Sequence, residues 1–98
     1  MRVVFAPAAR EDLKGIGDYI ARDNKAAAKR LVLDLQERAA RLGTAPRAGR
    51  LRSELKDVLR SVAFGSYVIF YQVEDTTIRV ERIIHGARDL GAVFDDEA

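Results

Sequence analysis

The feature that most constrains the fold is the strand-forming run DVLRSVAFGSYVIFYQVEDTTIRVERIIHG in the second half of the chain. Apolar residues either alternate with polar ones or fill whole stretches of it, and turn residues interrupt them. The run predicts three strands over Val58 to Phe64, Tyr67 to Val73 and Ile78 to His85, joined at Gly65-Ser66 and at Glu74 to Thr77. The second strand is apolar on both faces, as a central strand is. Connections this short join antiparallel neighbours, so the run predicts an antiparallel sheet.

The first half of the chain predicts a short strand followed by two helices. RVVFA, residues 2–6, is a β-branched and aromatic run, and Pro7 suits the first turn of a helix. Asn24 is a favourable N-cap for a second helix, which Gly43 ends. Helical spacing places the apolar residues of each helix on one face, namely Ala9, Leu13, Ile16 and Ile20 in the first and Ala28, Leu31, Val32, Leu35, Ala39 and Leu42 in the second. The two helices therefore form an αα-hairpin.

The predicted element order is β-α-α-β-β-β, which favours an α+β fold. The helical hairpin must cover one face of a small antiparallel sheet, because neither layer can bury its apolar side alone. Residues 44–56 predict a polar, basic loop, and Ala87 to Phe94 could form a short C-terminal helix. A chain of 98 residues without a repeat or linker predicts a single domain over residues 1–98.

Residue types that are missing or rare exclude several classes of protein. The chain has no cysteine and one histidine, so disulfides and thiolate metal sites are excluded, and we expect neither a metal nor a cofactor. The first residues lack the apolar core of about 7–15 residues that a signal peptide needs. No window reaches the roughly 18 apolar residues of a membrane span. We therefore expect a cytoplasmic protein that makes no membrane contact.

Basic residues are concentrated in the middle of the chain. Residues 38–60 contain seven arginines and lysines against Glu54 and Asp57, a local charge of +5, whereas the whole chain carries +2. One interpretation is a surface for an anionic or acidic partner. The other is a solvated helix end and loop, and the sequence leaves both open.

The segment IIHGARDL, Ile83 to Leu90, contains the single histidine and brings an arginine and an aspartate close to it. Histidine is the usual acid–base group near neutral pH, and arginine stabilises anionic transition states. RNA cleavage by 2′-hydroxyl attack requires groups of these kinds. The candidates are His85 and Glu81 as acid and base, with Arg60, Arg82 and Arg88 on the phosphate.

Strand alternation determines which of these candidates can act together. It places Ile78, Val80 and Ile84 on one face of their strand, and Arg79, Glu81 and His85 on the other. The alternative to an acid–base site is a solvent-facing strand that ends in a turn pinned by Arg88-Asp89. Composition and spacing alone support only an α+β domain with a basic flank.

Two segments of the strand-rich half, LRSVAFGSYVIFYQV and IRVERIIHGARDL, resemble the C-terminal half of ParE toxins. These toxins belong to the RelE/ParE superfamily of type II toxin–antitoxin systems. The stretch PAAREDLKGIGDYIARDN and the following alanine- and leucine-rich helix resemble the N-terminal half, so the resemblance covers nearly the whole chain. It implies a RelE/ParE-like fold, a helical hairpin against a small antiparallel sheet.

The resemblance implies one of two activities. RelE-like members are ribosome-dependent mRNA endonucleases, and ParE-like members inhibit DNA gyrase by binding. The nucleases carry an arginine where Val68 stands and tend to carry a C-terminal tyrosine or histidine, the tyrosine aligning with Phe94; neither residue here can replace them. The resemblance thus favours a gyrase-binding toxin without catalytic residues. An endonuclease using His85, Glu81 and Arg88 is the alternative, and a decayed toxin is a third reading.

The resemblance also implies partners and the residues that contact them. Target binding is expected from the C-terminal region, with Arg60, His85, Arg88 and Asp89. A cognate ParD-like antitoxin is expected to form a hetero-oligomer with the chain. Its arm should use apolar anchors on the helical hairpin and the neighbouring sheet edge, for which the candidates are Leu13, Ile16, Ile20, Leu31, Leu35 and Leu42.

Overall fold

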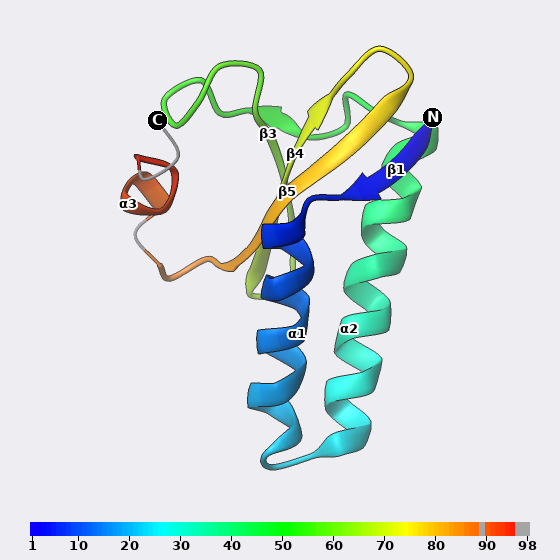
Figure 1. Cartoon of the computed structure of the whole chain (residues 1–98), viewed down its shortest axis with the longest axis vertical. Coiled ribbons are helices and arrows are strands. Elements are labelled where there is room, and N and C mark those ends of the chain that lie inside the picture. Colours follow the sequence, from blue (N-terminus) through cyan, green and yellow to red (C-terminus); the bar gives the residue numbers. More distant parts are fainter. Residues whose placement is uncertain (89, 96–98) are drawn as a thin grey trace.

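The computed structural model describes residues 1–88 and 90–95 as two helices packed on a twisted sheet (Figure 1). The helical hairpin consists of α1 (Pro7–Ala21) and α2 (Lys25–Ala40), and the 3-10 turn η1 (Arg41–Thr44) follows it. The strands are β1 (Arg2–Phe5), β2 (Arg50–Leu51), β3 (Arg60–Phe64), β4 (Tyr67–Val73) and β5 (Thr77–His85). A short helix, α3 (Leu90–Asp95), comes last. The α+β class and the helical hairpin are confirmed.

The sheet is mixed rather than purely antiparallel. Its strand order within the described residues is β1-β5-β4-β3-β2. The last three strands pair antiparallel as predicted, but β1 lies parallel to β5, with Val3 opposite Ile78. A parallel pair needs a long crossover connection, and here the helices and the other strands together supply it. Local sequence signals carry no information about such a distant pairing, so the fully antiparallel sheet was wrong at this edge.

The segment predicted as a loop contains the two-residue strand β2. Arg50 and Leu51 pair antiparallel with Ser61 and Arg60 of β3. The strand β3 begins only at Arg60. Val58 has a φ of 58°, a left-handed value that a β-branched residue rarely adopts and that is incompatible with a β-strand. The prediction of a strand from Val58 was therefore two residues too long.

Local signals explain the helical hairpin. Pro7 occupies the first turn of α1, and the Asn24 side chain caps α2 by accepting a hydrogen bond from the Ala27 N–H at 2.9 Å. A Cβ atom at Gly17 would lie 3.2 Å from Cγ2 of Val32, so the glycine allows the two helices to approach closely. Together α1 and α2 cover one face of the sheet.

A β-bulge in β5 reverses the alternation of its side chains. Tyr71 pairs with Val80 while the preceding Phe70 pairs with Arg82, so Glu81 is an extra residue in the strand. Beyond the bulge Ile83, rather than Ile84, joins Ile78 and Val80 in the core beneath the helices. The buried residues of this core are Ala9, Leu13, Leu35, Ala39, Leu42, Val62, Ile69, Tyr71, Ile78, Val80 and Ile83. The prediction that Ile84 shares a face with Ile78 and Val80 was wrong for this reason.

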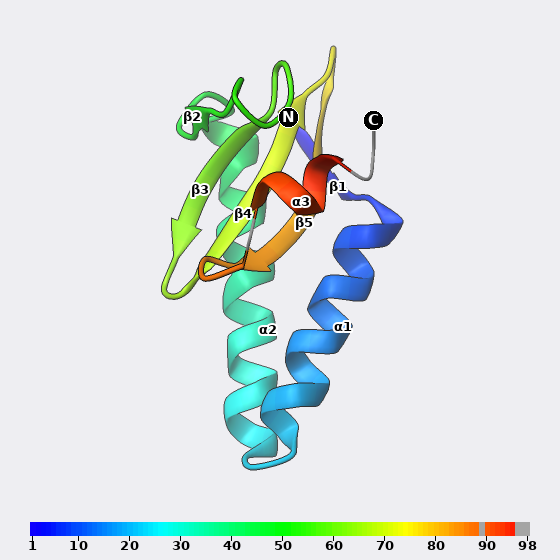
Figure 2. The ribbon, with the colours of Figure 1, turned by 90° about the vertical axis from the view of Figure 1, so that its left-hand side faces the viewer.

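The second face of the sheet is also covered. Leu59, Phe70, Ile84 and Phe94 form a separate buried cluster, which we call the second-face cluster. α3 contributes Phe94 to it, and the segment after β2 contributes Leu59; Figure 2 shows α3 on the side of the sheet away from α2. The rings of Phe70 and Phe94 meet edge to face with centroids 4.8 Å apart. The predicted C-terminal helix is therefore present, three residues later than its expected start.

Among the described residues, no helix combines the length and the apolar character that crossing a membrane requires.

Candidate functional site

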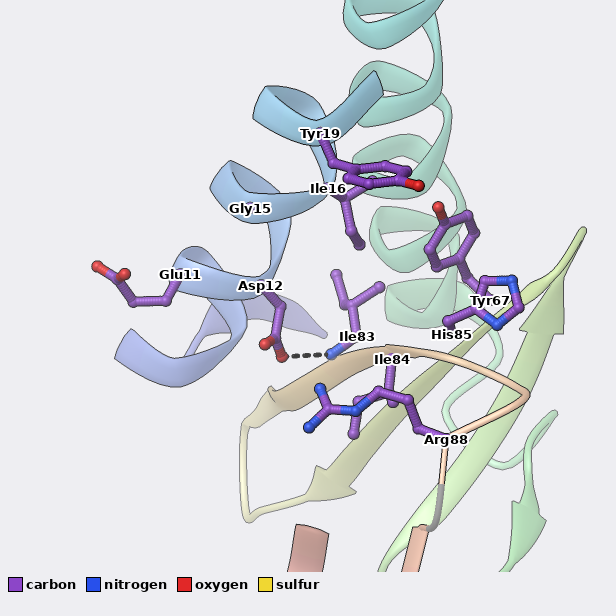
Figure 3. Close-up of a pocket in the computed structure, with 10 residues that line it drawn as sticks. All are labelled: Glu11, Asp12, Gly15, Ile16, Tyr19, Tyr67, Ile83, Ile84, His85 and Arg88. Atoms are coloured by element: carbon purple, nitrogen blue, oxygen red, sulfur yellow. Dashed lines mark hydrogen bonds between the residues drawn. The ribbon is translucent and has the colours of Figure 1, made fainter. Parts of the chain in front are cut away.

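A groove runs between α1 and the end of β5. It is open to solvent and has a volume of about 620 Å³ (Figure 3). α1 supplies Glu11, Asp12, Gly15, Ile16 and Tyr19 on one side, and the sheet and the following turn supply Tyr67, Ile83, Ile84, His85 and Arg88 on the other. The structure thus places two of the predicted target-binding residues, His85 and Arg88, at one recess. We call this recess the α1–β5 groove.

Asp12 fixes the floor of the α1–β5 groove. Its carboxylate accepts two hydrogen bonds from the Arg82 guanidinium, at 2.8 and 3.0 Å, and a third from the Ile83 N–H at 2.9 Å. β1 pairs with β5 only as far as Val80, so the edge of β5 beyond that point would otherwise expose the Ile83 N–H. The carboxylate supplies the acceptor that a neighbouring strand would otherwise provide, and it connects α1 to β5.

His85 has a defined orientation although its side chain is exposed. Its Nδ1 accepts a hydrogen bond from the Ala87 N–H at 3.1 Å, and its ring meets the Tyr67 ring edge to face with centroids 5.4 Å apart. An Nδ1 that accepts must carry no proton, so in the neutral imidazole the proton is on Nε2. The ring nitrogen of His85 that remains available, Nε2, is therefore a hydrogen-bond donor.

Arg88 is held through its backbone while its side chain stays available. Its N–H donates to the His85 carbonyl at 3.1 Å, which closes the turn after β5. The guanidinium makes no hydrogen bond or ion pair with residues 1–88 or 90–95 and is exposed to solvent. Asp89, the fourth predicted target-binding residue, lies outside the described residues.

The predicted acid–base pair is not assembled. Because of the bulge, His85 pairs with Tyr67 on the helix-covered face, whereas Arg79 pairs with Gln72 on the other face. Glu81 accepts a hydrogen bond from Arg79 Nε at 3.3 Å, so its carboxylate is directed to that second face. The prediction that Glu81, Arg79 and His85 share a face was wrong.

Arg60 lies at the other end of the sheet. It pairs with Tyr71 of β4, whereas His85 pairs with Tyr67, four residues along the same strand and so about 13 Å away along it. Its guanidinium donates to the Gly49 carbonyl at 2.7 Å. Arg60 therefore does not belong to the α1–β5 groove, and it has a structural partner of its own.

Tyr71 organises the segment that Arg60 contacts. Its buried hydroxyl accepts from the Gly49 N–H at 2.9 Å and donates to the Pro46 carbonyl at 2.8 Å. A Cβ atom at Gly49 would lie 2.6 Å from this hydroxyl, so only glycine allows the backbone to come this close. The loop before β2 is thus fixed on the sheet by one side chain.

Part of the basic middle segment also serves the fold. Arg52 donates to Glu54 at 2.8 Å and to the Ser61 hydroxyl at 3.1 Å, and it lies over the Phe70 ring at 5.7 Å. The hydrogen bond from Arg52 holds the pKa of Glu54 below its usual value. By contrast Arg41, Arg47 and Arg50 are exposed, so the charge that a partner could meet is smaller than the sequence count suggests.

Comparison with known proteins decides the family. Residues 3–90 match the model of the ParE toxin of the type II toxin–antitoxin system parDE. The chain belongs to the ParE toxin family. A relative in Caulobacter vibrioides, the toxin RelE2, is 38% identical over 87 residues, which is 89% of this chain and 97% of the relative.

Two solved toxin–antitoxin structures share the fold of this ParE-family chain. The chromosomal ParDE system of P. aeruginosa aligns with a TM-score of 0.76 at 22% identity, covering 87% of this chain and 95% of that one. The RelBE2 complex of Mycobacterium tuberculosis aligns with a TM-score of 0.66 at 29% identity, covering 86% and 95%. The likeness therefore extends to both named branches of the superfamily.

Val68 and Phe94, the two positions at which the sequence resemblance favours ParE over RelE, belong to the second-face cluster. Phe94 is 4% exposed and packs on Phe70, while Val68 is half-buried against the same cluster. In this ParE-family chain both positions are thus part of the apolar packing beneath α3.

The predicted antitoxin anchors divide into core and surface residues. Leu13, Leu35 and Leu42 are at most 7% exposed and belong to the core beneath the helices. Ile16, Ile20 and Leu31 are half-buried and keep some surface for a partner. A second groove of about 420 Å³ follows the free edge of β1 and includes Arg2, Phe5, Arg10 and Gln36 among its lining residues.

Asp12, Tyr19 and Tyr67 are among the residues of the α1–β5 groove that sequence reasoning missed. Asp12 gave no signal, because a carboxylate on a helix surface is ordinary. Tyr19 is 68% exposed, and in the sequence it stands outside the apolar face of its helix, a position that could have marked a contact surface. Tyr67 appeared only as one more apolar residue of a central strand.

Proposed function

We propose that this ParE-family chain is a toxin that inhibits DNA gyrase by binding and performs no chemistry of its own. The observation that carries the proposal is the place of Val68 and Phe94 in the second-face cluster. The residues that a RelE-like nuclease would use there, an arginine and a tyrosine, are replaced by side chains that neither bind phosphate nor transfer a proton. The gyrase target comes from the resemblance to ParE-like toxins.

The geometry of His85 supports the same proposal. To act as an acid the ring must carry protons on both nitrogens, and the second proton would point at the Ala87 N–H that now donates to Nδ1. To act as a base through Nε2, the ring must lose the proton that this tautomer holds there. The arrangement therefore suits His85 as a residue that donates a hydrogen bond from Nε2 to a binding partner.

We further propose that a cognate ParD-like antitoxin binds the toxin in a cytoplasmic hetero-oligomer. Both solved relatives were determined as toxin–antitoxin systems, which supports such a partner. The groove along β1, which we call the β1 groove, offers a free strand edge, and the half-buried anchors Ile20 and Leu31 offer apolar surface elsewhere on the helical hairpin. An arm that adds a strand or lays a helix there would use both.

A supercoiling assay with purified gyrase tests the target. We expect the toxin to inhibit supercoiling, and Arg88→Gln to raise the half-inhibitory concentration about ten-fold or more, as for a residue at the centre of an interface. Arg79→Gln is the matched control, because Arg79 lies on the other face of the sheet, and it should inhibit like the parent. Full supercoiling activity in excess toxin, with no trapped cleavage complex, would refute the gyrase proposal.

The mRNA endonuclease remains the second candidate, favoured by the 38% identity to the toxin RelE2 over nearly its whole length. Toxin added to translating ribosomes tests it. Codon-positioned cuts that disappear in His85→Ala would establish nuclease activity in place of gyrase binding. Their persistence in Glu81→Gln would agree with the separation of Glu81 from His85.

A further inference from the structure

The α1–β5 groove carries hydrogen-bond donors that have no partner among the described residues. They are the Arg88 guanidinium, Nε2 of His85, and the hydroxyls of Tyr19 and Tyr67 (Figure 3). The protein elsewhere uses its buried donors: within the described residues no buried side-chain nitrogen or oxygen lacks a hydrogen bond. The groove is thus a local excess of donors open to solvent.

The carboxylates of the groove do not offset this excess equally. Asp12 is neutralised by Arg82 and the Ile83 N–H, so it accepts little more. Glu11 is exposed on the outer side of α1, and in Figure 3 it points away from His85. The end of the groove at His85 and Arg88 therefore favours an anionic group.

The rest of the groove is apolar. Ile16 is half-buried and Ile83 is 2% exposed beneath it, and the rings of Tyr19 and Tyr67 stand on either side. Because Asp12 already holds the Ile83 N–H, the edge of β5 is closed to an added strand. An occupant must bind through its side chains.

We propose that the α1–β5 groove receives a segment of the toxin's target in which a carboxylate lies beside an aromatic or branched aliphatic side chain. The carboxylate meets Arg88, and the apolar side chain lies between Tyr19 and Tyr67 over Ile16. This rests on the proposed function, because His85 and Arg88 are its target-binding residues. It adds Tyr19 and Ile16 of α1 to the target contacts, and it leaves the β1 groove, on another side of the fold, to the antitoxin.

A titration with phenylacetate, followed by amide and His85 ring signals in NMR spectra, tests the chemistry without gyrase. Phenylacetate carries both required groups, acetate lacks the ring, and phenylacetamide lacks the charge. We expect saturable shifts at Ile83, His85 and Arg88 for phenylacetate alone, with a dissociation constant on the order of 1–10 mM. Arg88→Gln should abolish them and Arg79→Gln should preserve them. Equal shifts with all three compounds, or shifts that survive Arg88→Gln, would overturn the proposal.

Gyrase and antitoxin assays on Tyr19→Ala identify the occupant. Leu33→Ala is the matched control, because Leu33 is an exposed apolar residue of α2 that does not line the groove. We expect Tyr19→Ala to weaken gyrase inhibition about ten-fold and to change antitoxin affinity less than about two-fold, with Leu33→Ala unchanged in both assays. The reverse pattern would assign the groove to the antitoxin and overturn the proposal. If the parent toxin fails to inhibit gyrase, the proposed target is wrong, and the phenylacetate titration still decides whether the groove has this chemistry.

Discussion

The two ends of the sheet use the same residue types in different ways. At one end Arg60 and Arg52 donate to Gly49, Ser61 and Glu54, so both cations are engaged by the chain itself. At the other end Arg88 has no partner among the described residues, and Nε2 of His85, at the rim of the α1–β5 groove, makes no hydrogen bond with them. Two arginines of the basic segment are thus used by the fold, while Arg41, Arg47 and Arg50 of the same segment stay exposed. Where a cation is held, rather than how many are present, determines what a partner can meet.

The largest expected effect concerns Asp12 of α1, whose hydrogen bonds to Arg82 and Ile83 connect α1 to β5 at the groove end of the sheet. In Asp12→Ala the Arg82 guanidinium loses two hydrogen bonds and the Ile83 N–H loses its acceptor, which should cost about 3 kcal/mol of unfolding free energy. Glu11→Ala, next to it but exposed, should stay within about 0.5 kcal/mol. Urea denaturation measures both, and equal losses would mean that Asp12 is not the connection described above.

The second effect concerns the end of the sheet at which Arg52 and Arg60 are bound, which we call the held end. Tyr71→Phe removes the hydroxyl that serves Gly49 and Pro46 and should cost about 1–3 kcal/mol, because two buried backbone groups lose a partner. Tyr19→Phe removes an exposed hydroxyl and should leave thermal unfolding nearly unchanged. A thermal shift of similar size in the two variants would show that the loop before β2 is held by other contacts.

Exchange of one arginine at each end tests the comparison directly. Arg60→Gln should lower the unfolding free energy by about 1 kcal/mol through the lost bond to Gly49, with gyrase inhibition intact. Arg88→Gln should change stability by less than about 0.5 kcal/mol while inhibition falls. Denaturation and supercoiling assays on both proteins are needed. If Arg60→Gln abolishes inhibition in a folded protein, the distinction between the two ends is lost.

The smallest effect is the pH dependence of the pair at the held end. Arg52 lowers the pKa of Glu54 from its ordinary 4.5, so the ionised form is favoured by folding. Its contribution is present above pH 4.5 and disappears as the pH falls through the lowered pKa. The carboxylate is exposed, so the stability difference between the parent and Glu54→Gln should be small and should vanish in acid. A difference that grows on acidification would have the wrong sign.

The sequence predicted those parts of the fold that depend on local pattern. Pro7 and Asn24 marked the helix starts, and the alternation in the second half marked β3, β4 and β5. β1 parallel to β5 could not be predicted, because the pairing joins residues more than seventy positions apart. The bulge at Glu81 was equally hidden, since one extra residue leaves the composition unchanged and reverses every later side chain.

The candidate site was predicted in part for the same reason. His85 and Arg88 lie three positions apart in the sequence, and both line one groove. Arg60 and Glu81 were assigned by residue type, and the strand order and the bulge place them elsewhere. Asp12 and Tyr19 lie on α1, and only the packing of α1 on β5 reveals that they belong to the site.

The parallel pairing of β1 with β5 has a consequence for how the chain folds. The first strand to be synthesised has its partner in the last one, and the Asp12–Arg82 contact likewise joins residues 70 positions apart. Contacts this distant require a large loop to close before they contribute any stability, which slows folding. Until β5 has been made, α1 has no edge to close, and the α1–β5 groove does not exist. We expect the ability to bind through it to arise late in folding, in a single step with the completion of the sheet.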